Sequence, residues 1–172
     1  MNTRISATVM MTSALALAAC SKKAPEELPP APVEEAAPAP AATPAPTGPS
    51  VGSMEHFLAA VGQVNTVVYF DTDRYNIDAE DSAKLQAQAQ YFTQYPSVTF
   101  TIEGHADERG TRDYNLALGE RRANAAKNYM VSLGIPASRI RTVSYGKERP
   151  VALGSNESAW AQNRRAATIT IN

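Results

Sequence analysis

The sequence has few of the residues that build metal centres and covalent cross-links. Its 172 residues include one cysteine and two histidines, His56 and His105. A single cysteine excludes an internal disulfide, and two histidines without a spacing such as His-x-x-x-His do not indicate a zinc site. We therefore predict no metal and no cofactor, and we expect His105 to be either exposed or satisfied by hydrogen bonds.

The sequence also lacks an excess of charge of one sign. Its formal net charge is −1, so no overall basic field attracts nucleic acid. Lysines and arginines are scattered without a recurring aromatic platform, and no glycine-rich phosphate loop follows a predicted strand. Nucleic-acid binding is therefore disfavoured.

Long apolar runs are absent except near the N-terminus. One basic residue, Arg4, precedes an apolar run from Ile5 to Leu17, and small residues lead to Cys20. This is the layout of a secretory signal, and the run is too short for a standard membrane-spanning helix. The ending Leu-Ala-Ala-Cys resembles the bacterial lipobox, which implies cleavage before Cys20 and covalent lipid on it (N-acyl and S-diacylglycerol). The alternative is an ordinary signal peptide with an incidental cysteine.

The residues after the cysteine indicate a destination and a tether. Ser21 stands where an aspartate would favour the inner membrane, so the lipobox resemblance points to the outer membrane. Nine of the twelve prolines fall between Pro25 and Pro49, in a segment that buries too little apolar surface to fold and that reaches up to about 90 Å if extended. We predict a signal peptide at 1–19, the lipidated cysteine and disordered tether at 20–53, and a folded domain at 54–172 with its core at about 66–171.

The folded part shows alternating strand and helix signals. β-branched, aromatic and alternating apolar residues predict strands, and capping residues, acidic first turns and helix breakers bound the helices. After a short lead-in we expect strand 66–71, a helix from Asp78 to Pro96, strand 98–103, a helix from Thr111 or Asp113 to about Leu133, strand 140–146, a turn or short helix at 158–163 and strand 165–171. This order predicts an α+β domain with a mixed sheet packed against helices, whose last strand pairs antiparallel at an edge or inside the sheet.

Two charged residues stand out because they can serve one ligand. Asp107 follows the strand at 98–103, and Arg122 lies on the apolar face of the next helix, four residues after Leu118. Together they offer one carboxylate and one guanidinium without an activated nucleophile or metal cluster, which favours recognition over catalysis. The alternative for Arg122 is a structural ion pair, with Asp107 as a possible partner.

Four segments carry a resemblance to a known family. They are Val-Tyr-Phe-Asp-Thr-Asp at 68–73, Glu-Gly-His-Ala-Asp-Glu-Arg-Gly at 103–110, Tyr-Asn-Leu-Ala-Leu-Gly-Glu-Arg-Arg-Ala at 114–123 and Asn-Arg-Arg at 163–165. In sequence and spacing they resemble the OmpA-like peptidoglycan-binding domain, over about residues 66–171. The resemblance implies a βαβαββ fold and a non-catalytic function.

The resemblance also implies a ligand, the diaminopimelate of the peptidoglycan stem peptide. Asp107 would accept hydrogen bonds from its ammonium, and Arg122 would clamp its carboxylate. Further contacts are implied for four residues, each with a plainer alternative: turn chemistry for Thr72 and Asp73, a solvated loop arginine for Arg109, and core packing for Leu118. Arg164 and Arg165 are expected to make structural contacts.

The lipobox and the tether together imply partners and a location in the cell. They resemble the lipid-anchored branch of the family that works with the Tol system, which implies peptidoglycan, TolB and the outer membrane as partners and a periplasm-facing domain. TolB and peptidoglycan would then compete for overlapping surfaces during envelope constriction at cell division. Two alternatives stay open: a peptidoglycan hydrolase or amidase, and a related accessory of a secretion or motility system.

Overall fold

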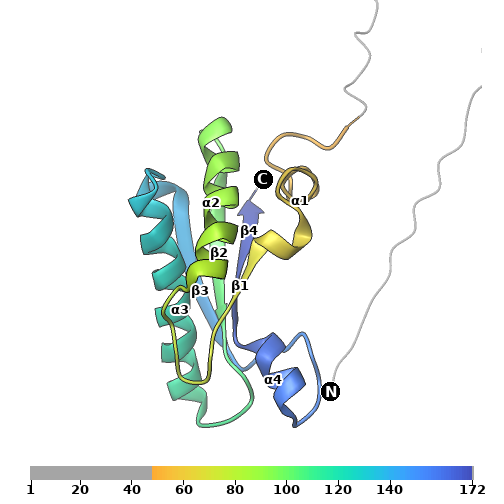
Figure 1. Cartoon of the computed structure of the whole chain (residues 1–172), viewed down its shortest axis with the longest axis vertical. Coiled ribbons are helices and arrows are strands. Elements are labelled where there is room, and N and C mark those ends of the chain that lie inside the picture. Colours follow the sequence, from red (N-terminus) through yellow and green to blue (C-terminus); the bar gives the residue numbers. More distant parts are fainter. Residues whose placement is uncertain (1–47, 172) are drawn as a thin grey trace, which may run out of the picture. The chain divides into compact units, whose positions relative to one another are not determined.

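The computed structural model describes residues 48–171 (Figure 1). The predicted signal peptide, Cys20 and most of the tether lie outside the described residues. Within them, no helix is long and apolar enough to cross a membrane. The elements follow in the order α1 (Met54–Val61), 3-10 helix η1 (Gln63–Thr66), β1 (Val67–Tyr69), α2 (Ala79–Gln94), β2 (Thr99–His105), α3 (Arg112–Ser132), 3-10 helix η2 (Ala137–Arg139), β3 (Ile140–Gly146), α4 (Glu157–Asn163) and β4 (Arg165–Ile171).

The strands form one mixed sheet in the order β1-β4-β2-β3. β2 and β3 are parallel, whereas β4 is antiparallel to both of its neighbours, β1 and β2. The predicted α+β fold is therefore confirmed, with the last strand inside the sheet. This insertion separates β1 from β2 by one strand, and the loops that follow β1 and β2 meet at the same end of the sheet (Figure 1).

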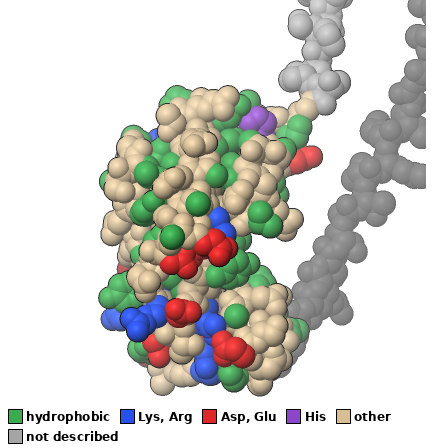
Figure 2. Space-filling model, viewed as in Figure 1, with side chains coloured by type: hydrophobic (Ala, Val, Ile, Leu, Met, Phe, Trp, Pro, Cys, Tyr) green, Lys and Arg blue, Asp and Glu red, His purple; other side chains and the backbone are tan. Residues whose placement is uncertain are grey.

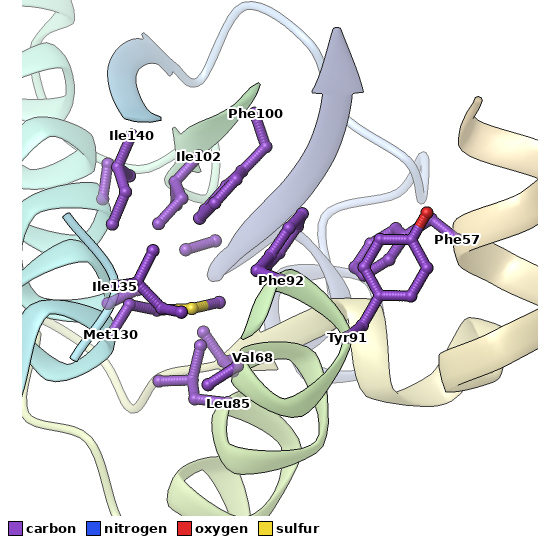
Figure 3. Close-up of a cluster of buried hydrophobic side chains, with 14 of the residues drawn as sticks. Phe57, Val68, Leu85, Tyr91, Phe92, Phe100, Ile102, Met130, Ile135 and Ile140 are labelled. Atoms are coloured by element: carbon purple, nitrogen blue, oxygen red, sulfur yellow. The ribbon is translucent and has the colours of Figure 1, made fainter. Parts of the chain in front are cut away.

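The hydrophobic core lies between the sheet and the helices α2 and α3 (Figure 3). Phe92 of α2 stacks on Phe100 of β2, with ring centroids 3.7 Å apart. α1 joins this core through Phe57, which contacts the rings of Tyr91 and Phe92. Fully buried aliphatic residues fill the remaining space: Val68, Leu85, Ile102 and Met130. The core fixes α3 along β2 and so sets the distance between Asp107 and the residues of α3.

Two glycines bring α3 close to the C-terminal end of β2. A Cβ atom on Gly104 would lie 1.8 Å from the carbonyl oxygen of Gly119, so neither backbone could approach as closely with a larger residue. The close contact places the α3 side chains next to the loop that follows β2. β2 itself continues to His105, two residues beyond the predicted end of the strand.

The first strand and the helix starts show how local chemistry sets the boundaries. β1 is shorter than predicted and ends at Tyr69, because a turn closed by the Arg74 N–H and the Asp71 carbonyl (3.1 Å) follows directly. Asp78 caps α2, as predicted, by accepting from the Asp81 N–H at 2.8 Å. Thr111 rather than Asp113 caps α3, since its hydroxyl accepts from a backbone N–H of the first turn.

Candidate ligand-binding site

A cavity of about 300 Å³ lies where the loops after β1 and β2 meet the first turns of α3. Its lining includes all six residues that the sequence predicted for ligand binding, Thr72, Asp73, Asp107, Arg109, Leu118 and Arg122, together with Ala106, Gly110, Tyr114 and Asn115. The structure thus brings the six residues together, and their role in binding stays a prediction. On the face seen in Figure 2, charged side chains gather in the middle and lower part of the domain.

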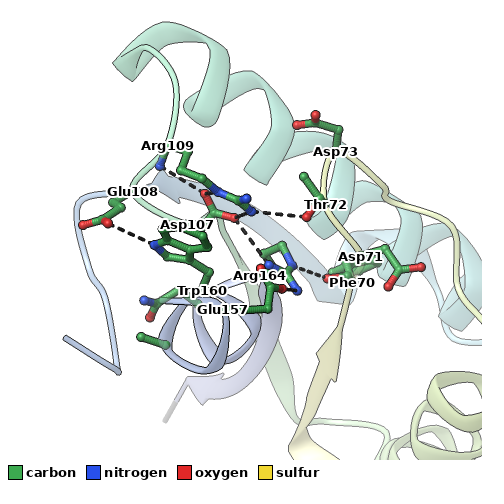
Figure 4. A network of polar contacts seen from close by, with 12 residues as sticks. Phe70, Asp71, Thr72, Asp73, Asp107, Glu108, Arg109, Glu157, Trp160 and Arg164 are labelled. Atoms are coloured by element: carbon green, nitrogen blue, oxygen red, sulfur yellow. Dashed lines mark hydrogen bonds and ion pairs between the residues drawn. The ribbon is translucent and has the colours of Figure 1, made fainter. Parts of the chain in front are cut away.

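Asp107 is buried at the end of β2, with its carboxylate held by two arginines (Figure 4). Its Oδ1 accepts from the backbone N–H and the Nε–H of Arg109, both at 3.0 Å, and its Oδ2 accepts from Arg109 Nη2 at 2.6 Å. Nη1 of Arg164 lies 3.6 Å from Oδ2. Burial alone would raise the pKa of Asp107, but the hydrogen bonds and positive charges of these arginines outweigh it and hold the pKa below its ordinary value. Asp107 is therefore a carboxylate at neutral pH.

Arg122 is fully buried and binds backbone carbonyls instead of a carboxylate. Its Nε donates to Arg74 at 2.9 Å, its Nη1 to His105 at 2.8 Å and its Nη2 to Asp71 at 3.0 Å. Among the described residues it forms no ion pair, so the structural ion pair with Asp107 considered from the sequence is wrong. The guanidinium instead joins the loop after β1 to the end of β2.

The charge of Arg122 is retained despite its burial. Burial lowers its pKa to about 10, while the negative charge of Asp107 acts in the opposite direction. At neutral pH the group is thus a cation without a direct counter-ion in the described part of the chain. Three of its five N–H groups serve the carbonyls, which leaves two donors. Since a buried charge is costly without a partner, this guanidinium is suited to an anion entering the cavity.

Two hydrogen bonds link the opposite sides of the cavity mouth. Arg109 Nη2 donates to the Thr72 hydroxyl at 3.2 Å, and the Tyr114 hydroxyl donates to Asp73 Oδ1 at 3.1 Å. Asp73 has a positive φ of 56°, a left-handed conformation that aspartate tolerates better than most residues. The turn chemistry proposed for Asp73 is therefore real, and it directs the loop after β1 toward α3.

The short helix α4 contacts the loop after β2, a role that was not predicted from the sequence. The Trp160 indole N–H donates to Glu108 Oε1 at 2.9 Å, and the Arg109 guanidinium lies 4.2 Å from the centre of the indole ring (Figure 4). No local pattern pairs Trp160 with a loop about fifty residues earlier, so only the tertiary structure reveals this contact. Tyr114, which lines the cavity, was also not predicted as a site residue, although it belongs to the segment 114–123 that resembles the family.

Arg164 and Arg165 make the structural contacts expected of them. Arg164 donates to the Phe70 carbonyl at 2.9 Å and to Glu157 Oε1 at 2.7 Å, and thereby ties α4 to the end of β1. Arg165 donates to the Arg149 carbonyl at 3.2 Å. Arg164 also adds positive charge beside Asp107, so it contributes to the electrostatics of the cavity from outside its lining.

The expectation for His105 was wrong, since its ring is neither exposed nor satisfied. The side chain is 1% exposed, and neither ring nitrogen has a hydrogen-bond partner among the described residues. Burial first, and then the charges of Arg165 and Arg149, lower its pKa to about 3, so the ring is neutral. Residues 48–171 contain no group of three or more side chains that could hold a metal ion.

Comparison with known proteins places the chain in a family. The OmpA family matches residues 69–164. The peptidoglycan-associated lipoprotein of Agrobacterium fabrum is 48% identical over 164 residues, which cover 95% of this chain and 86% of the relative. That of Rhizobium meliloti is 48% identical over 161 residues, covering 94% and 85%. The crystal structure of the peptidoglycan-associated lipoprotein from Burkholderia pseudomallei is 46% identical and superposes with a TM-score of 0.60, covering 62% of this chain and 90% of that one.

A more distant likeness shows the fold alone. The C-terminal domain of Helicobacter pylori MotB is 17% identical, with a TM-score of 0.58 over 62% of this chain and 84% of that one. The fold, the cavity and the matched residues together define a member of the OmpA family. Within that family the chain belongs to the peptidoglycan-associated lipoproteins. Membership of this family also distinguishes a binding protein from a peptidoglycan hydrolase. The peptidoglycan-associated lipoproteins are structural proteins, and the chain is not an enzyme.

Proposed function

We propose that this protein binds the diaminopimelate of the peptidoglycan stem peptide and anchors the outer membrane to the cell wall. The observation that carries the proposal is that Asp107 and Arg122 line one cavity with opposite charges. Diaminopimelate ends in a carbon that bears both an ammonium and a carboxylate. Asp107 offers acceptors for the first, and the two remaining donors of Arg122 suit the second.

The dimensions of the cavity fit the end of a side chain. Its volume of about 300 Å³ lies at the small end of ligand pockets, so it suits an amino-acid terminus better than a glycan. Leu118, which is 4% exposed, lines the cavity beside the charged groups and can pack against the methylene chain of the ligand. The site therefore combines two charge contacts with a small apolar surface.

The proposed attachment to the membrane rests on the sequence that precedes the domain. Acylation of Cys20 would place several acyl chains on one residue, which gives durable attachment where a single chain gives only reversible binding. The tether would let the domain reach the cell wall from the outer membrane. Attachment would then be bivalent, so a modest affinity at the peptidoglycan site would suffice.

We further propose that the protein belongs to the Tol system and that TolB competes with peptidoglycan for the domain. The support is the resemblance to the lipid-anchored branch of the family, which would link the anchor to envelope constriction during division. A protein of a secretion or motility system would share the domain without this partner. Adding purified TolB to the binding assay below separates the two, because competition would lower the amount of protein bound to peptidoglycan.

Co-sedimentation with purified peptidoglycan sacculi tests the site. We expect Asp107→Asn and Arg122→Lys each to weaken binding by about tenfold or more, since each disrupts a charge-assisted contact. Arg112→Ala is the matched control, because Arg112 is exposed on the same helix and pairs with Glu148 on the surface. Thermal unfolding checks that the variants remain folded. Undiminished pelleting of both folded variants would disprove the proposed pair.

A further inference from the structure

One face of the sheet has no share in the hydrophobic core. The core between the sheet and the helices α1, α2 and α3 contains Phe100 and Ile102 of β2 (Figure 3). Successive side chains of a strand point to opposite faces, so Thr101 and Glu103 of β2 lie on the other face. α4 lies at the end of the sheet, where its Trp160 contacts the loop after β2 (Figure 1). We call the side of the sheet that carries Thr101 and Glu103 the outer face.

The strands on both sides of β2 turn larger apolar side chains toward the outer face. In β4, the Thr168 hydroxyl donates to a glutamine of α2 at 2.6 Å, so the neighbouring Ile169 lies on the outer face. In β3, the Ser144 hydroxyl donates to a backbone carbonyl of α3 at 2.7 Å, so the neighbouring Val143 lies there as well. A strand that serves only one core places its apolar residues on the core side. The reversal at these positions therefore indicates a second contact surface.

The apolar residues of the outer face are only partly covered within one chain. Strand pairing aligns them across the sheet, and they are Val67, Val143, Ala167, Ile169 and Ile171. Ile171 is 46% exposed, the other four are half-buried, and none of the five belongs to the core of the described domain. A partner that covers this face would remove the remaining apolar surface from water, which is favourable.

Two charges of opposite sign stand on the outer face without a partner in their own chain. Glu103 lies 3.8 Å from the His105 ring, but that ring is neutral, and Arg165 acts on Glu103 only from a longer distance. Arg141 of β3 is exposed and is opposite Thr101, the residue next to Glu103 on the same face. Within residues 48–171, neither Glu103 nor Arg141 forms an ion pair with a charged group. The outer face thus offers one free carboxylate and one free guanidinium side by side.

We propose that the outer face binds a second copy of this chain around a twofold axis. A twofold contact brings the same surface of each copy together, so each Glu103 meets the Arg141 of the other copy. The charges that lack partners in one chain thus form two reciprocal ion pairs, and the apolar residues around them pack as in two face-to-face sheets. The cavity beside Asp107 lies on the side of α3, so both copies keep it open.

The contact suits copies that are held close together. The apolar surface is small and two ion pairs at a solvent-exposed contact add little, so dilute copies in free solution stay monomeric. Copies held on one membrane by the proposed lipid have a higher local concentration, which favours the dimer. The inference goes beyond the proposed function and does not depend on the peptidoglycan site.

Sedimentation equilibrium of the full chain with Cys20→Ala, which cannot be acylated, tests the contact in solution. Over a series of rising concentrations the average mass should move from monomer toward dimer. Ile169→Glu should keep the chain monomeric throughout, because the dimer would bury an unpaired charge. Val131→Glu is the matched control, since Val131 is 39% exposed on α3, and it should dimerise like the parent chain. Thermal unfolding checks that each variant remains folded.

Charge reversal tests the reciprocal ion pairs. Glu103→Arg alone and Arg141→Glu alone each set like charges against one another, and each should raise the dissociation constant of the dimer by about tenfold or more. An equimolar mixture of the two variants should dimerise again, because each arginine then meets a glutamate of the other copy. An ion pair within one chain could not give this recovery on mixing.

Each of three results would overturn the proposal. The first is a mass that stays monomeric over the whole concentration series. The second is a dimer that the folded Ile169→Glu variant leaves intact. The third is a mixture of the two charge-reversed variants that associates no better than either variant alone, and this result decides the matter if Ile169→Glu fails to fold.

Discussion

His105 lies at the end of β2 with its ring buried and both nitrogens without hydrogen-bond partners among the described residues. Its pKa is about 3, against an ordinary 6.5. Between these values the unfolded chain binds a proton that the folded chain does not. The free energy of unfolding contributed by this group therefore falls as the pH drops from about 6.5 toward 3. The groups that face the ring are Glu103, Tyr145, Arg149 and Arg165.

Replacing this histidine should therefore remove part of the acid sensitivity of the protein. In His105→Phe the ring is kept and the titrating group is lost, so the melting temperature should fall less steeply with decreasing pH than in the unaltered protein. Thermal unfolding in steps between about pH 7 and pH 4 measures the two slopes, and the carboxylates that both proteins share contribute equally. Parallel curves would show that His105 does not carry this dependence.

At the scale of single residues, sequence reasoning worked where chemistry and spacing coincide. Asp107 and Arg122 were predicted as a charge pair for one ligand, and the structure places both in one cavity. The partners of Arg122 were not predictable, because they are backbone carbonyls of the loop after β1 and of the last residue of β2. The same holds for His105, since its burial depends on strands and loops that lie far apart in the sequence.

At the scale of elements, capping residues and residue patterns predicted most helix and strand boundaries, but they did not predict the order of the strands in the sheet. The acidic cap at Asp78 and the bounds of strand 140–146 were both predicted correctly. β1 was predicted too long because Phe70 extends the run of β-branched and aromatic residues up to the turn that begins at Asp71. The position of β4 between β1 and β2 follows from packing across the whole sheet, which no single segment specifies.

The helix α4 provides the element-scale prediction, because it supports the binding loop. Its N-cap is Asn156, whose side-chain oxygen accepts from the Ala159 N–H at 3.0 Å. Asn156→Ala should lower the free energy of unfolding by about 1 kcal/mol. It should also weaken sacculus binding, since α4 carries Trp160 and leads into Arg164.

The matched variant is Asn156→Asp, which keeps an oxygen acceptor at the cap and suits the N-terminus of a helix. Urea denaturation measures the stability of both variants, and co-sedimentation with sacculi measures binding. We expect the aspartate variant to resemble the unaltered protein in both. If the alanine variant is destabilised but binds undiminished, α4 supports the fold without supporting the site.

At the scale of the whole molecule, the proposed function requires two attachments on one chain. The described domain carries the peptidoglycan site, and the predicted lipid on Cys20 lies outside the described residues. Linked sites raise the effective local concentration of each other's targets only when both belong to the same molecule. The proposal therefore requires that the peptidoglycan site and the lipid belong to the same chain.

A bridging assay tests this connectivity. Phospholipid vesicles carrying the lipidated protein should pellet with sacculi at low speed, while vesicles alone stay in solution. Cys20→Ala should still bind sacculi but leave the vesicles behind, because a chain without acyl groups lacks its membrane attachment. Lipidated Asp107→Asn should stay on the vesicles without pelleting them. A mixture of the two variants supplies both attachments on separate chains, so it should fail to bridge, and vesicle pelleting by that mixture would contradict an anchor that works through a single tethered chain.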